Sequence, residues 1–141
     1  MRKVIFVLLA VVLATSLGSL ALAFGDKPGG KVIAYYFHGN FRCSTCMNME
    51  KYSKEAIEDN FNDVLVSGKL TFKAVNVEEQ GNEHFVSDYQ LYTKTLILSF
   101  VKEGKEVKSK NLDKIWEYAH NKQRFIDYIT EEVGNFLKEA K

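Results

Sequence analysis

Two cysteines separated by two residues are the feature that most constrains what this chain can fold into. Cys43 and Cys46 are the only cysteines in the 141-residue sequence, and they follow an apolar, β-favouring run over residues 32–37. The residues that follow, 47–57, read as a helix, so we predict a strand that leads into a helix whose first turn carries both sulfurs. Unpaired N–H groups and the helix dipole at that end favour a thiolate, which is the reactive form. We expect Cys43 to be the more exposed and more acidic of the two.

The close spacing of the cysteines leaves a metal site as an alternative to a redox pair. A structural disulfide across two residues closes a tiny loop, so it gains little from the chain entropy of the unfolded state. Cys43 and Cys46 could instead bind a soft cation, Cu(I) or Zn(II), together with His38, with the sulfur of Met47 as a further candidate ligand. The other interpretation of His38 is loop packing or hydrogen bonding.

The first 23 residues have the features of an export signal. Basic residues precede an apolar core over residues 4–13, and residues 21–23 read Ala-Leu-Ala, a small-x-small cleavage site. We expect residues 1–23 to be removed as a signal peptide and the glycine-rich residues 24–30 to form a linker. An uncleaved segment would instead anchor the protein in a membrane. The sequence predicts an exported, periplasmic protein that is soluble after cleavage.

The rest of the chain, residues 31–141, predicts a single α/β domain. The formal net charge is only +1 and no basic stripe is present, which argues against a nucleic-acid partner. Hydrophobic patterns predict the order β-α-β-α-β-β-α, with an extra helical turn before the last helix. The middle crossover implies parallel strands, and a hairpin at Glu103-Gly104 implies an antiparallel pair. Trp116, Tyr118 and Phe125 are expected to pack in the last helical layer.

A Cys-x-x-Cys motif after the first strand of this order resembles the thioredoxin superfamily, from Lys31 to Ala140. The resemblance implies a central mixed sheet flanked by helices and a thiol–disulfide oxidoreductase without a cofactor. Cys43 would attack a substrate disulfide and Cys46 would resolve the mixed disulfide. Its partners would be protein thiols or disulfides and, for a reductant, a membrane electron donor. A soft-metal binding or delivery protein, and an adaptor with a vestigial site, are the alternative hypotheses.

The chain departs from thioredoxins at three places. Arg42 replaces the tryptophan before the first cysteine, and its charge could stabilise a thiolate or simply be solvated. Thr95 stands at the position of the thioredoxin cis-proline, so we expect a trans Lys94–Thr95 bond and less shielded sulfurs. The buried carboxylate of thioredoxins has no counterpart, since Phe37 fills the matching strand position. Glu50 could play a related part or be an ordinary surface carboxylate.

Overall fold

The computed structural model describes residues 29–140. The predicted signal peptide and nearly all of the predicted linker lie outside these residues. The elements follow in the order β1 (Lys31–His38), α2 (Ser44–Asn60), α3 (Asn62–Val66), β2 (Leu70–Asn76), α4 (His84–Asp88), β3 (Thr95–Lys102), β4 (Lys105–Asn111), α5 (Ile115–Tyr118) and α6 (Lys122–Glu139). The predicted element order is confirmed, with α3 as an additional short helix. Within residues 29–140, no helix is both long and apolar enough to cross a membrane.

The four strands form one mixed sheet in the order β2-β1-β3-β4. The first two strands are parallel, whereas β3 runs antiparallel to both β1 and β4. The predicted antiparallel hairpin is confirmed, and the parallel pair is β1 and β2, which are joined by the helical crossover through α2. Glu103 and Gly104 turn the chain from β3 to β4 with positive φ angles of 53° and 75°, a conformation that matches the twist of a tight hairpin. β1 lies between β2 and β3 in the sheet. The chain therefore leaves β1 and enters α2 near the centre of the sheet and not at its side.

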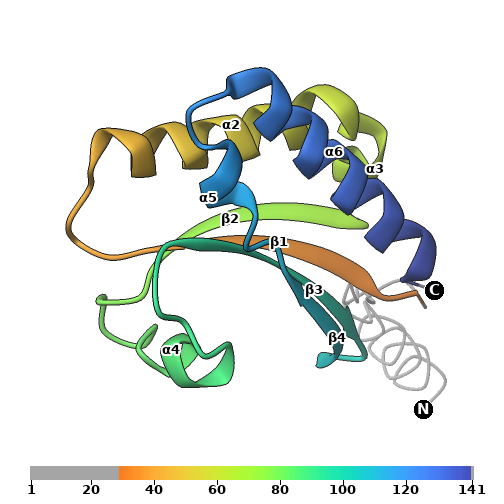
Figure 1. The fold of residues 1–141 in the computed structure, drawn as a ribbon. Coiled ribbons are helices and arrows are strands. Elements are labelled where there is room, and N and C mark those ends of the chain that lie inside the picture. The colour runs from red at the N-terminus through yellow and green to blue at the C-terminus, as the bar shows by residue number, and fades with distance from the viewer. Residues whose placement is uncertain (1–28, 141) are drawn as a thin grey trace, which may run out of the picture.

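Helices α2 and α6 cover one face of the sheet, and α4 lies on the other face (Figure 1). Alternate residues of β1 and β3 point toward α2 and α6 and form the main core, as a period of two requires. The helices contribute apolar residues at helical spacing. The largest buried contributors from the two helices are Met49, Ile57, Phe125, Ile129, Val133 and Phe136. This core fixes α2 against the sheet and thereby fixes the position of both cysteines.

The opposite face of the sheet carries an aromatic cluster beneath α4. Tyr35 and Phe37 of β1 stack with their ring centroids 5.4 Å apart, and Phe85 and Tyr89 pack against them. The Tyr89 hydroxyl donates a hydrogen bond to Glu106 of β4. Phe37 is buried within this cluster.

Candidate functional site

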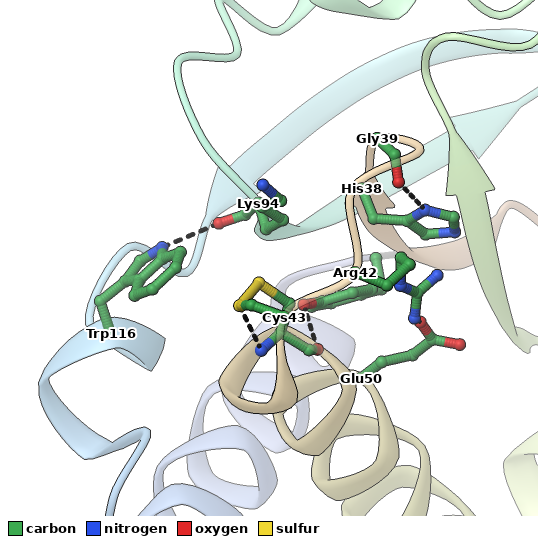
Figure 2. Close-up of a disulfide and its surroundings, with 9 residues drawn as sticks. His38, Gly39, Arg42, Cys43, Glu50, Lys94 and Trp116 are labelled. Atoms are coloured by element: carbon green, nitrogen blue, oxygen red, sulfur yellow. Dashed lines mark hydrogen bonds and ion pairs between the residues drawn. A yellow bond between two sulfur atoms is a disulfide. The ribbon is translucent and has the colours of Figure 1, made fainter.

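Cys43 and Cys46 form a disulfide in the first turn of α2 (Figure 2). Cys43 is the N-cap of the helix, and its extended backbone, with φ −76° and ψ 157°, ends the loop from β1. The backbone N–H of Cys46 donates to the Cys43 sulfur at 3.1 Å. One of the unpaired N–H groups of the helix start therefore points at Cys43 Sγ, where it can stabilise negative charge on that sulfur.

The two cysteines differ in their access to solvent. Cys43 is half-buried, whereas Cys46 is only 1 % exposed. The prediction that Cys43 is the more exposed cysteine is confirmed. The expectation that Thr95 leaves the sulfurs less shielded than a proline would stays a prediction. An incoming sulfur would reach Cys43 first.

Tyr36 supports the cysteine turn from below, and strand alternation allows only one of Tyr35 and Tyr36 to face the cysteines. This buried tyrosine of β1 donates its hydroxyl to the Cys46 carbonyl oxygen at 2.7 Å. Burial and, to a smaller extent, the Glu50 carboxylate raise the pKa of the Tyr36 hydroxyl, and Arg42 opposes them. The hydroxyl thus stays protonated and keeps donating. Strand alternation placed Tyr36 on the helix-covered face, which was the available signal.

Arg42 and Glu50 form an ion pair beside the disulfide through Arg42 Nη2 and Glu50 Oε2. Their side chains retain 31 % and 27 % exposure, so both are mostly enclosed. Arg42 Nε is buried and has no hydrogen-bond partner among residues 29–140. Arg42 is therefore not a freely solvated loop residue, and Glu50 is not an isolated surface carboxylate. The structure brings these two predicted supporting residues together with the cysteines.

Thr95 begins β3 and is almost completely buried. The Thr95 hydroxyl donates to Asn111 Oδ1 of β4 at 2.5 Å, so it is already used within the sheet. The described peptide bonds include no cis bond, and the predicted trans Lys94–Thr95 bond is confirmed. The role of Thr95 near the sulfurs stays a prediction.

His38 ends β1, and its Nδ1 lies 3.0 Å from the Gly39 carbonyl oxygen. This contact fits the hydrogen-bonding interpretation of His38. Across residues 29–140, no three His, Cys, Asp or Glu side chains gather in a way that could hold a metal ion. The two sulfurs are bonded to each other here, so the metal hypothesis for Cys43, Cys46 and His38 stays a prediction about the reduced protein.

Lys94 connects two other segments near the disulfide. Its carbonyl oxygen accepts a hydrogen bond of 2.8 Å from the indole Nε1 of Trp116, and its ammonium lies 5.7 Å from the centre of the Phe41 ring. The expectation that Trp116 packs inside the last helical layer is wrong, since it is 39 % exposed. Helix α5 is a single turn, and its buried position is taken by Ile115. The expectation holds for Phe125, which is buried.

Three exposed apolar side chains belong to the segments that carry or adjoin the cysteines. Phe41 precedes Cys43 and is 74 % exposed, Met47 follows Cys46 and is 49 % exposed, and Trp116 reaches the region from α5 (Figure 2). We call these three residues the apolar rim. Contiguous exposed apolar surface is typical of surfaces that contact other molecules, whereas single exposed apolar side chains are common.

No family model and no curated protein matches the chain. Among solved structures, the chain is similar to thioredoxin from Fasciola hepatica, with 19 % identity, a TM-score of 0.45 and coverage of 81 % of this chain and 85 % of that one. It is also similar to a thioredoxin from Thermus thermophilus, with 16 % identity, a TM-score of 0.44 and coverage of 73 % and 74 %. The mixed sheet, with β1 between β2 and β3 and the cysteine pair at the start of α2, carries the fold assignment. The chain has a thioredoxin-like fold.

Proposed function

We propose that this protein is an exported thiol–disulfide oxidoreductase that acts on protein disulfides through Cys43 and Cys46. The observation that carries the proposal is the position of the Cys43 sulfur. It is partly accessible, caps α2, accepts the Cys46 N–H at 3.1 Å and is bonded to a nearly inaccessible partner sulfur. This arrangement suits one cysteine for attack and the other for resolution.

The exchange proceeds in two balanced steps from the reduced protein. The Cys43 thiolate attacks one sulfur of a substrate disulfide, forming a mixed disulfide and expelling the second substrate sulfur as a thiolate. The Cys46 thiolate then attacks Cys43 Sγ, breaks the mixed disulfide and releases the first substrate sulfur. Two electrons pass to the substrate, and the protein is left with the Cys43–Cys46 disulfide. The same steps run backwards when the substrate is the dithiol, and the relative reduction potentials decide the direction.

The surroundings of the cysteines support this chemistry in different ways. Tyr36 holds the Cys46 carbonyl and so fixes the turn that carries the resolving sulfur. The apolar rim offers contact surface for a polypeptide next to Cys43. A protein working as a reductant would be recharged by a dithiol donor, for which a membrane protein is our candidate.

The proposed activity is tested with paired cysteine variants. Cys43→Ser should abolish reduction of insulin disulfides by dithiothreitol-charged protein, and Cys46→Ser should accumulate mixed disulfides with proteins of its own compartment. Ser44→Ala, an exposed change between the two sulfurs, is the matched control and should keep the activity. If the wild type reduces no disulfide and Cys46→Ser captures no protein, the oxidoreductase proposal is wrong.

Export is tested separately, by cell fractionation and by the intact mass of the purified protein. We expect the mature chain to begin at Phe24 and to occur in the periplasmic fraction. A full-length chain that stays in the membrane fraction would support the anchored alternative.

A further inference from the structure

The ion pair beside the cysteines points to a factor that sets how easily their disulfide is reduced. This inference rests on the proposed function. We propose that Glu50 is a positioning residue that holds the Arg42 guanidinium away from the Cys43 sulfur and thereby keeps the disulfide more reducing than it would otherwise be.

Arg42 and Glu50 lie on either side of the two cysteines in the sequence. Arg42 directly precedes Cys43, and Glu50 lies one helical turn beyond Cys46 in α2. In Figure 2 the Arg42 guanidinium extends toward Glu50, while the two sulfurs lie on the other side of Cys43. With 31 % and 27 % exposure, the two side chains are shielded from water and salt more than an ordinary surface pair.

The guanidinium also has donor capacity that the oxidised protein does not use. Nη2 contacts Glu50, whereas the buried Nε has no partner among residues 29–140. A guanidinium presents five N–H donors in a fixed fork, and a buried donor without an acceptor requires an explanation. Reduction creates a new anion one residue away, at Cys43. A guanidinium freed from Glu50 could turn its donors toward that thiolate.

Both charges act on the turn that holds the sulfurs. The Tyr36 hydroxyl donates to the Cys46 carbonyl oxygen. Glu50 raises the pKa of this hydroxyl and Arg42 lowers it, each by less than burial raises it. An anion at Cys43, in the same helix turn, would be stabilised by Arg42 and destabilised by Glu50 for the same reason.

The direction of the effect on the redox equilibrium follows from which state carries the charge. The disulfide is neutral, and the reduced form can carry a thiolate at Cys43. A positive charge near Cys43 therefore stabilises the reduced form and makes the disulfide a stronger oxidant. Glu50 neutralises and holds that positive charge, so its removal should shift the equilibrium toward the reduced protein.

The test is the equilibrium with glutathione, in which the protein disulfide plus two glutathione molecules gives the dithiol plus glutathione disulfide. The reduced fraction is counted by alkylation and mass spectrometry across buffers of known ratio. We expect Glu50→Gln to shift the equilibrium constant toward the reduced protein by about threefold, the scale of a partly screened ion pair. Glu58→Gln, which also removes a carboxylate of α2 paired with a lysine, is the matched control and should cause no shift.

A double-mutant cycle separates positioning of Arg42 from the direct charge of Glu50. In an Arg42→Met background, Glu50→Gln should shift the constant less than it does with Arg42 present. Equal shifts in both backgrounds, no shift, or a shift toward the oxidised protein would overturn the inference while leaving the proposed function intact. A wild type that does not equilibrate reversibly with glutathione would overturn the proposed function and this inference with it. Urea unfolding of each variant confirms that the compared proteins are folded.

Discussion

The first turn of α2 and the middle of the same helix are built in opposite ways. The first turn exposes Met47 and part of Cys43, while the middle buries Met49, Ala56 and Ile57 completely against the sheet and α6. The reactive sulfur thus sits at the open end of a helix whose other turns are locked in the core. The reactive cysteine and the rigidly packed residues therefore lie at different turns of α2, and the packing of the later turns fixes the position of the Cys43 sulfur.

The largest effect is expected where the core holds α2. Phe125 of α6 is fully buried and meets Tyr52 of α2 with ring centroids 5.8 Å apart. Phe125→Ala should lower the free energy of unfolding by about 4 kcal/mol, because it removes buried apolar area and leaves a cavity. Denaturant unfolding of the oxidised protein measures this, with the exposed Phe41→Ala as the control. If Phe125→Ala lowered the free energy of unfolding less than Phe41→Ala does, the contrast between the first turn and the middle of α2 would be wrong.

The second effect concerns the accessible sulfur at the open end. In the reduced protein, Cys43 should react with iodoacetamide at pH 6 about tenfold faster than Cys46, because the helix start favours its thiolate and Cys46 is buried. Peptide mapping after brief alkylation measures the two rates in one sample. Equal rates would show that the first turn opens on reduction and that the asymmetry belongs to the disulfide form alone.

The third effect links the two regions through Tyr36. Tyr36→Phe removes the hydrogen bond to the Cys46 carbonyl and keeps the buried ring, so the free energy of unfolding should fall by about 1 kcal/mol. Tyr118→Phe, at a partly buried tyrosine between α5 and α6, is the comparison variant. If both changes cost the same and Cys46 alkylation is unaltered, Tyr36 does not hold the cysteine turn.

The smallest effect is a pH dependence in the middle of the helix. Lys122 of α6 bonds Glu55 of α2 at 2.7 Å, which lowers the pKa of Glu55 and raises the pKa of Lys122. The stabilisation is therefore present at neutral pH. It is lost as the pH falls through the lowered Glu55 value, and it is also lost as the pH rises through the raised Lys122 value. Lys122→Met should flatten both limbs of the stability profile slightly, and unchanged limbs would mean that this ion pair contributes nothing.

The fold was predictable because its signals are local. Apolar alternation marked β1, apolar residues at helical spacing marked α2 and α6, and Glu103-Gly104 marked the hairpin. The position of Cys43 at the helix start followed from the same patterns, since a helix that begins at a Cys-x-x-Cys motif must place the first sulfur near its cap.

The contacts around the cysteines were not predictable in the same way. Arg42 and Glu50 are eight positions apart, one in the loop and one in the helix, and meet only through their side chains. Trp116 and Lys94 are 22 positions apart and flank the β3–β4 hairpin, so their contact depends on the pairing of these two strands. Such contacts depend on loop conformation, which no periodic pattern encodes, and they surround the part of the molecule where the chemistry takes place.

The bond between Trp116 and Lys94 gives the protein a spectroscopic property. Trp116 is the only tryptophan in the sequence, and it lies in the surroundings of the disulfide, partly open to water (Figure 2). The indole emission of the protein therefore comes from this single site, where Trp116 Nε1 donates to the Lys94 carbonyl oxygen. That emission follows the surroundings of this one contact in real time, without a label.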